Sequence, residues 1–257
     1  MTAIAHAGYM TGRHLRALAR QPWYIAFTLL QPLVYLLIFG ALFEKASLIP
    51  GFGSDSYITF LTPGVLVMSA LFTAVWNGMD ILEDMKRGTL DRFLVTPVWR
   101  GALIAGPIAN AAVSSLVQAA VIFGVGSLLG AHYEGGIAGV AVLIVASLLL
   151  TAPFAAFSNA VALTARQEET MIGLANFVAL PLTFLASGFI PLDLAPNWIQ
   201  TVARFNPVNW ALEAGREALS AAPDWGLIGI RLGSLVVVGA VLFTLATSAF
   251  RSYQRSI

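Results

Sequence analysis

The residues able to do polar chemistry are concentrated in one short stretch of an otherwise apolar chain. The sequence DILEDMKRGTLDRFLVTPVWR, residues 80–100, holds four acidic and four basic residues among 21 positions. A long uncharged run lies on each side of it. This pattern predicts a hydrophilic island between two membrane-spanning helices. We call residues 80–100 the charged island, and expect a partner protein to push on the membrane part there.

The order of residues inside the charged island predicts where one helix ends and another begins. Gly88 suits the end of the helix that leaves the membrane, and Thr89 can cap a new short helix through its side-chain oxygen. The new helix would carry an apolar face and end at Pro97. Such a face either fits a groove in another protein or dips into lipid, and both readings stay open on physics alone. The candidate contact residues are Glu83, Arg87, Gly88, Thr89, Leu90, Asp91, Phe93, Leu94 and Pro97.

Motifs of several enzyme classes are missing from the chain. It has no G-x-x-x-x-G-K-[ST] phosphate loop, because its only lysines, Lys45 and Lys86, lie in FEKA and MKRG. It also has no H-E-x-x-H, no G-x-S-x-G and no cysteine. The uncharged runs contain no Asp or Glu, which disfavours intramembrane proteolysis and carboxylate proton relays. We therefore expect no catalytic residue, metal or cofactor on this chain, and an external source of energy.

Composition predicts an all-α integral membrane protein that forms a single transmembrane domain, residues 1–257. Of the 257 residues, 58% are hydrophobic and 11% are charged, and the mean hydropathy is +0.81. A soluble domain carries roughly 25% charged residues. The charges form no basic patch, so we expect no nucleic-acid partner.

The uncharged windows predict six transmembrane helices. Each window has 19 to 33 residues, and a spanning helix needs about 20. With the N-terminus in the cytoplasm, ten of the 14 Lys and Arg residues lie inside and four outside, which predicts a cytoplasmic (inner) membrane protein with both termini in the cytoplasm. Residues 2–21 then form either an amphipathic interfacial helix or a basic tail that only fixes topology. The windows are residues 21–43, 56–79, 101–133, 135–165, 170–192 and 232–250.

Amide side chains also lie inside these windows, and we expect five of them to form hydrogen bonds between helices more often than substrate contacts. These five are Gln31, Asn110, Gln118, Asn159 and Asn176.

A second unusual stretch, residues 187–219, is too polar to span a membrane and too apolar for an ordinary loop. Pro196 can open one short helix, and the pair Asn206 and Pro207 breaks it before a second helix begins near Val208. This pattern predicts two half-helices that dip into the outer leaflet and return. A folded loop lying on the membrane surface is the alternative.

The chain resembles the membrane subunit of type-2 ABC exporters over nearly its whole length. Its strongest motif, EDMKRGTLDRFLVTPVWR (residues 83–100), is similar to the charged cytoplasmic loop of that family. The second motif, SGFIPLDLAPNWIQTVARFNPVNWALEAGREAL (residues 187–219), is similar to the outer segment of the drug-exporter-like members. The two motifs occur in the family's order within a frame of six spans.

The resemblance implies a role for each segment. The charged island would hold a coupling helix that inserts into a separate nucleotide-binding ATPase subunit, which binds the ATP and Mg²⁺. A second permease copy would complete a homodimer or heterodimer. Residues 2–21 of this chain would be the interfacial connecting helix. The outer segment would close the exit of the pathway through Ser187, Gly188, Pro191, Pro196, Trp198, Asn206, Pro207 and Arg216.

The function that follows is ATP-driven export of a hydrophobic or amphipathic substrate, such as a drug, a lipid or a lipid-linked glycan. The alternative is a self-contained channel or membrane scaffold, whose island merely binds lipid. Stimulation of a partner ATPase would separate the two.

Overall fold

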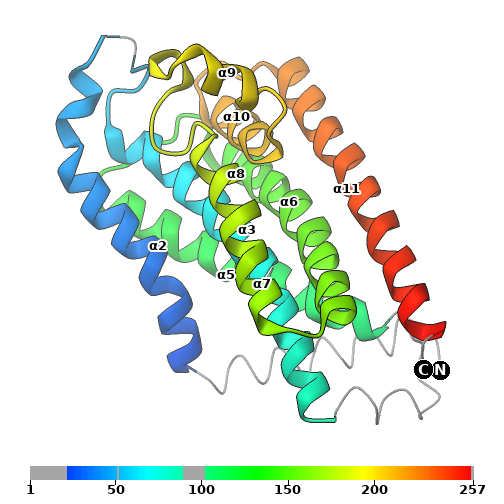
Figure 1. The fold of residues 1–257 in the computed structure, drawn as a ribbon. Coiled ribbons are helices and arrows are strands. Elements are labelled where there is room, and N and C mark those ends of the chain that lie inside the picture. Colours follow the sequence, from blue (N-terminus) through cyan, green and yellow to red (C-terminus); the bar gives the residue numbers. More distant parts are fainter. Residues whose placement is uncertain (1–21, 51, 89–101, 256–257) are drawn as a thin grey trace.

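The computed structural model describes residues 22–50, 52–88 and 102–255, and the regular structure in these ranges is helical throughout. The predicted all-α architecture is confirmed for this part of the chain. Residues 2–21 and 89–100, which include the predicted interfacial helix and most of the charged island, lie outside it. In chain order the elements are α2 (Pro22–Leu42), the 3-10 turn η1 (Glu44–Leu48), α3 (Tyr57–Lys86), α5 (Ala102–Leu128), α6 (Gly136–Ala165), α7 (Glu168–Leu174), the π-helical turn η2 (Ala175–Ala179), α8 (Leu180–Phe184), the 3-10 turn η3 (Leu192–Leu194), α9 (Asn197–Ala203), α10 (Pro207–Leu219) and α11 (Trp225–Arg255) (Figure 1).

Four of the described helices are long and apolar enough to cross a membrane: α3, α5, α6 and α11. The predicted window 21–43 coincides with α2. The window 170–192 coincides with the run from α7 through η2 to α8, which ends at Phe184. The described helices are therefore consistent with a membrane protein, and the count of six spans stays a prediction.

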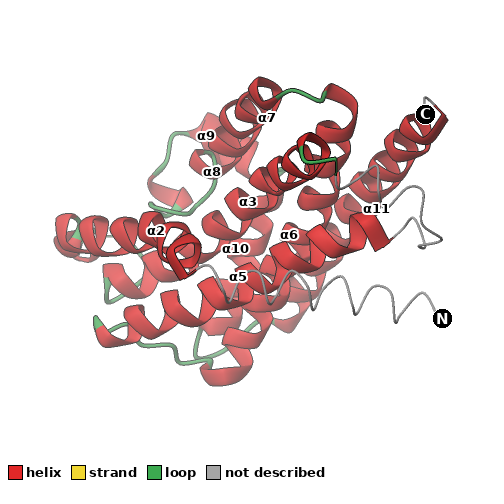
Figure 2. Ribbon diagram, turned by 90° about the horizontal axis from the view of Figure 1, so that it is seen from below, coloured by secondary structure: helices red, strands yellow, loops and turns green. Residues whose placement is uncertain are grey.

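α3 is the central helix of the bundle. It packs against α2, α5, α6, α7 and α10, and it lies between them when the molecule is seen from below (Figure 2). Its approach to α6 is close at Gly78, whose backbone N–H donates to Ser158 Oγ at 3.1 Å. A Cβ atom at Gly78 would lie 2.7 Å from the carbonyl oxygen of Ser158, so only glycine fits this contact. α3 and α6 therefore form one tightly packed unit.

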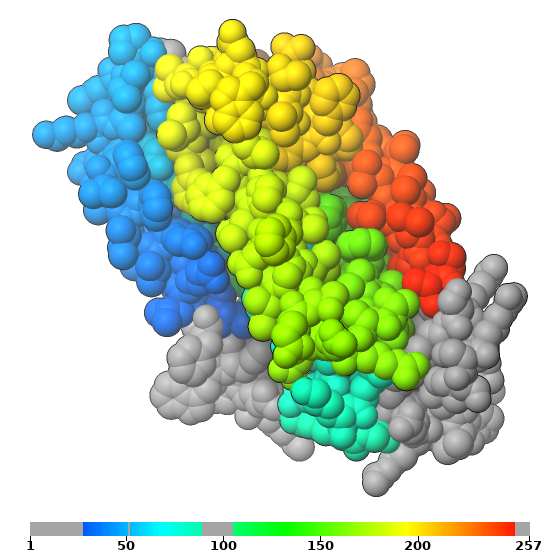
Figure 3. Space-filling view, viewed as in Figure 1, coloured from blue at the N-terminus to red at the C-terminus, as the bar shows by residue number. Residues whose placement is uncertain are grey.

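α2 and α11 form opposite flanks of the molecule (Figure 3). Both carry apolar side chains that the bundle leaves uncovered, among them Leu37 and Ile38 on α2 and Val236 and Val237 on α11. In a membrane protein such faces meet lipid tails or another membrane helix.

The two ends of α3 lie at opposite ends of the bundle, and we name them after one residue each. At the Arg216 end α3 begins, and η3, α9 and α10 gather around it (Figure 1). At the Gly88 end α3 stops, α2 starts and α11 finishes. The described start of the first sequence motif (residues 83–100) thus lies at the Gly88 end, and the second motif (residues 187–219) lies at the Arg216 end.

α11 begins seven residues before the predicted window 232–250, so the expected start of this span was wrong. The window was cut by the charge of Arg231. In the structure Arg231 Nε lies 2.5 Å from Oε2 of Glu213 on α10. Because the charge has a partner, the helix continues past it.

Candidate functional site

At the Gly88 end, the chain leaves α3 through a glycine turn. α3 ends at Lys86, and Gly88 has a φ of +64°, a left-handed conformation that favours glycine. The Gly88 N–H donates to the carbonyl oxygen of Met85 at 3.0 Å. The prediction that the helix ends at Gly88 is confirmed.

The described part of the charged island is held by two buried apolar residues and by exposed ion pairs. Ile81 and Leu82 are buried and pack in one cluster with residues of α6 and α7, namely Ala162, Leu163 and Met171. Arg87 pairs with Glu83 one turn earlier on α3, and Lys86 pairs with Glu168 on α7 at 2.5 Å. All four side chains are largely exposed. Exposed pairs of this kind contribute little to stability. The remaining candidate contact residues, Thr89, Leu90, Asp91, Phe93, Leu94 and Pro97, lie outside the described residues.

At the Arg216 end, one guanidinium joins three parts of the chain. Arg216 Nη1 donates to the carbonyl oxygen of Ser187 at 2.6 Å and to Ser187 Oγ at 3.0 Å. Arg216 Nη2 donates to the carbonyl oxygens of Phe60 at 3.1 Å and Gly188 at 3.3 Å. The guanidinium carbon also lies 3.6 Å from the centroid of the Phe60 ring, within range of a cation–π contact. Arg216 thereby ties α10 to the loop after α8 and to the first turn of α3.

Asn206 organises the start of α10 and the end of α8. Its Oδ1 accepts from the Val208 N–H at 2.9 Å and so caps α10, which begins at Pro207. Its Nδ2 donates to the carbonyl oxygens of Leu182 at 2.7 Å and Leu185 at 3.1 Å. The predicted helix break at the pair of Asn206 and Pro207 is confirmed.

The remaining candidate residues of this segment are Pro191, Pro196, Trp198 and Gly188. Pro196 precedes α9, as predicted, and Pro191 precedes η3. Trp198 on α9 is largely exposed. Gly188 lies so close to α3 that a Cβ atom at Gly64 would come within 2.2 Å of its carbonyl oxygen. The structure thus brings together Ser187, Gly188 and Arg216, while Asn206 joins the start of α10 to the end of α8.

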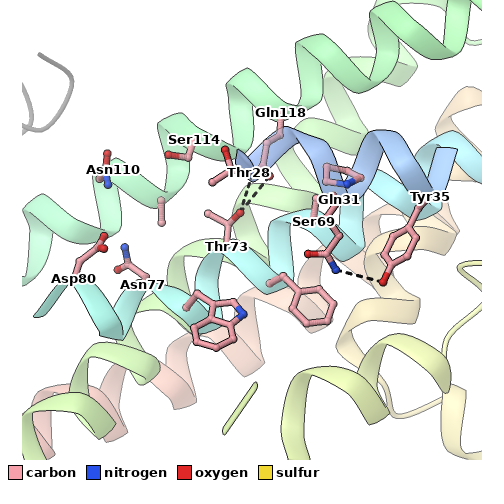
Figure 4. Close-up of a pocket in the computed structure, with 14 residues that line it drawn as sticks. Thr28, Gln31, Tyr35, Ser69, Thr73, Asn77, Asp80, Asn110, Ser114 and Gln118 are labelled. Carbon is pink, nitrogen blue, oxygen red and sulfur yellow. Dashed lines mark hydrogen bonds between the residues drawn. The ribbon is translucent and has the colours of Figure 1, made fainter. Parts of the chain in front are cut away.

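Between the two ends, a polar cavity of about 270 Å³ lies among α2, α3 and α5 (Figure 4). Gln118 Nε2 on α5 donates to Thr73 Oγ1 on α3 at 3.1 Å, so the interhelical bond predicted for Gln118 is confirmed. Gln31 instead donates to Tyr35 on its own helix at 3.3 Å. The residues that line the cavity are Thr28, Gln31, Pro32, Tyr35, Ser69, Phe72, Thr73, Trp76, Asn77, Asp80, Asn110, Ala111, Ser114 and Gln118.

The expectation of interhelical hydrogen bonds was wrong for the other three amides among the described residues. Asn176 Nδ2 donates to the Ile172 carbonyl oxygen of the same helical run at 2.9 Å. Both polar atoms of Asn159 are buried without a hydrogen-bond partner, and so is Oδ1 of Asn110. The sequence pattern identifies a polar residue in a span but not whether its neighbour offers a partner.

The cavity contains one residue that the sequence analysis assigned elsewhere. Asp80 was taken as the first residue of the charged island, and the spans were expected to hold no acid. The structure continues α3 to Lys86, and Asp80 lines the cavity within that helix. A usable signal was present, because Ser69, Thr73, Asn77 and Asp80 recur at helical spacing and form a polar stripe on one face of α3.

Comparison with known proteins decides the family. Residues 6–220 match the model of the ABC-2 type transporter family. The chain belongs to the ABC-2 type transporter family. The resemblance carried by its two motifs is therefore confirmed, and the chain is a transport permease of the ABC type.

Curated relatives within the ABC-2 family cover most of the chain. It is similar to the daunorubicin resistance ABC transporter permease protein DrrB1 of Streptomyces coeruleorubidus, with 29% identity over 255 residues, covering 98% of this chain and 88% of that protein. It is similar to Nodulation protein J of Rhizobium leguminosarum bv. trifolii, with 27% identity, covering 87% of this chain and 84% of the relative. The linearmycin resistance permease protein LnrN of Bacillus subtilis is 25% identical over 193 residues, covering 74% of this chain and 48% of that relative.

Proposed function

We propose that this ABC-2 permease exports an amphipathic or hydrophobic substrate, such as a drug, a lipid or a lipid-linked glycan, with energy from a separate ATPase subunit. The observation that carries the proposal is the course of α3. This one helix joins the charged island to the Arg216 end and lines the polar cavity between them. At 1.5 Å per residue, its 30 residues span about 45 Å.

The charged island is the contact for the ATPase in this proposal. Gly88 turns the chain out of α3, and the residues from Thr89 to Pro97 form a short coupling helix that fits a cleft of the ATPase. ATP and Mg²⁺ bind to that partner, while this chain contributes neither a phosphate loop nor a catalytic residue. Closure of the ATPase pushes on the island, and α3 carries the displacement as a rigid rod because α6 packs so closely against it at Gly78.

The Arg216 end closes the outer exit of the pathway in this proposal. Arg216 holds α10, the loop at Ser187 and the start of α3 together, so a displacement of α3 strains all of these bonds at once. The Gly88 end faces the cytoplasm, with six spans and both termini inside, in the cytoplasmic membrane. Uncovered apolar side chains on α2, among them Leu37 and Ile38, support a second permease copy or lipid as the neighbour.

One property of the relatives and one of this chain support the substrate class. Two of the relatives are named for resistance to daunorubicin and to linearmycin. The cavity of this chain mixes aromatic and amide side chains, as sites for amphipathic molecules do. A self-contained channel or scaffold is the competing function, and it needs no ATPase.

Site-specific capture tests the partner. The chain has no native cysteine, so an Asp91→Cys variant carries a photo-crosslinker at one place in native membranes. We expect mass spectrometry to identify a nucleotide-binding ATPase subunit at this position. The matched control is Leu128→Cys, an exposed position at the far end of α5, which should capture no ATPase. Capture of lipid alone at both positions would favour the channel or scaffold.

A further inference from the structure

One end of the polar cavity gathers acceptor groups that lack donors. Asp80 and Asn77 from α3 and Asn110 from α5 lie together at this end, and Tyr35 and Gln31 lie at the other (Figure 4). No hydrogen bond or ion pair from the described part of the chain reaches the Asp80 carboxylate, although ion pairs occur nearby at Glu83 and Lys86. A carboxylate inside a protein cavity usually has a partner, and the described residues supply none for Asp80.

Asn77 makes the same end acceptor-rich in a second, independent way. Its side chain is 5% exposed, and its Nδ2 donates to the Pro107 carbonyl oxygen of α5 at 3.2 Å. That bond fixes the amide, and leaves Oδ1 buried with no hydrogen-bond partner. A buried acceptor without a donor costs stability, so it is expected to serve a ligand.

The walls of the cavity suit a cation and repel an anion. Among its described lining residues Asp80 is the one charged side chain, and none is Lys, Arg or His. Trp76 lies one turn before Asp80 on α3 and is 41% exposed, which leaves its ring accessible. A cavity lined by both a tryptophan and a carboxylate is a favourable environment for an ammonium group, which also brings several N–H donors.

We propose that this cavity binds the cationic, amine-bearing end of an amphipathic substrate, with Asp80 as the counter-charge and Asn77 Oδ1 as a second acceptor. The inference rests on the proposed export function and specifies its substrate class. A volume of about 270 Å³ is at the lower limit for a site that encloses a whole small molecule. The cavity therefore takes one end of the substrate, and the apolar remainder extends towards α2 and lipid.

The test is a binding experiment without the ATPase, so that its outcome does not depend on coupling. The permease is placed in lipid nanodiscs and titrated with two fluorescent probes, dansyl-diaminooctane, which carries a protonated amine, and its N-acetyl derivative, which is neutral. Empty nanodiscs correct for partition into lipid. We expect saturable binding of the cationic probe, and affinity for the neutral probe lower by about tenfold or more, because a hydrogen bond to a charged group is lost.

Two substitutions at position 80 and one control complete the design. Asp80→Asn should reduce affinity for the cationic probe to that for the neutral one, and Asp80→Glu, which keeps the charge, should retain part of the preference. The control is Asp193→Asn, which removes an exposed carboxylate at the Arg216 end, from a residue that does not line the cavity. It should leave the preference unchanged.

Three outcomes would overturn the inference: equal affinity of the wild-type permease for both probes, no saturable binding of either, or a preference that survives Asp80→Asn. None of these outcomes changes the expected capture of an ATPase by a crosslinker at position 91. Conversely, a cationic preference together with failure of that capture would keep the binding site and reject ATP-driven export.

Discussion

The two ends of α3 differ in how they are held, although one helix connects them. At the Arg216 end, the side chains of Arg216, Asn206 and Asn209 make hydrogen bonds to backbone groups of α3, of α8 and of the loop after α8. At the Gly88 end, the described part of α3 beyond Asp80 is held by apolar packing of Ile81 and Leu82 against α6 and α7, by a glycine turn and by two exposed ion pairs. Net contributions are larger for buried, charge-assisted bonds than for exposed pairs.

The difference between the two ends of α3 indicates which end of this permease can move with a small change in free energy. Apolar packing is non-directional and allows packed helices to slide by small amounts, whereas a hydrogen-bonded end opens only when many bonds break together. The described structure therefore combines an Arg216 end fixed by directional hydrogen bonds with a Gly88 end held by apolar packing and exposed ion pairs, next to which the cavity lies. Under the proposed orientation, this is a state closed to the outside.

The largest effect is expected from removing the central tie. Arg216→Met keeps an apolar stem of similar length but removes the donors to Ser187, Gly188 and Phe60. We expect a loss of about 3 kcal/mol or more in stability, because each buried acceptor left without a donor costs about 1–3 kcal/mol. The measurement is the melting temperature of the purified permease in detergent.

Arg204→Met is the matched control for this prediction. Arg204 lies at the same end and is exposed, and its side chain makes no hydrogen bond or ion pair within the described residues; its backbone carbonyl oxygen accepts from Trp210 Nε1 at 2.7 Å. We expect the control to melt like the wild type. If Arg216→Met also melts like the wild type, the Arg216 end is not the tied end.

A smaller effect is expected from forcing α3 away from the loop at Gly188. A Cβ atom at Gly64 would lie 2.2 Å from the Gly188 carbonyl oxygen, a backbone atom that cannot simply turn aside. Gly64→Ala should therefore lower stability by about 1–3 kcal/mol, the range typical of overpacking. The control, Gly124→Ala on α5, has open space around its Cβ position and should melt no lower than the wild type. Equal melting of both variants would mean that the contact at Gly64 relaxes freely.

The sequence was informative wherever local chemistry decides the structure. Proline and glycine set helix ends through their own backbone geometry, so the ends at Gly88, Pro196 and Pro207 could be predicted. Long uncharged windows likewise predicted the apolar helices, because the cost of a buried charge depends on the residue itself.

The features that sequence reasoning missed depend on contacts between distant segments. Arg231 interrupts an uncharged window, but Glu213 on another helix neutralises it and α11 continues. Asp80 was grouped with its charged neighbours in sequence, whereas α2 and α5 leave a cavity beside it in space. Nothing local to Arg216 indicates that its donors reach backbone oxygens of Phe60, Ser187 and Gly188.

The smallest effect is expected at the Gly88 end, from reversing the ion pair between α3 and α7. The side chains of Lys86 and Glu168 are 63% and 46% exposed, so water and salt already screen their attraction. We expect Lys86→Glu, Glu168→Lys and the double exchange to melt within about 1 °C of the wild type, since exposed pairs contribute little.

Transport gives the same pair of positions a different readout. If the Gly88 end moves in each cycle, Lys86 and Glu168 separate or slide as α3 shifts past α7. The single variants should then change the stimulated ATPase rate of the assembled transporter at low salt, and the double exchange should restore it. At high salt the wild type and the three variants should have the same stimulated ATPase rate, because salt screens the ion pair. A melting loss as large as that of Arg216→Met would instead show that the Gly88 end is tied as firmly as the other, and the contrast between the two ends of α3 would be lost.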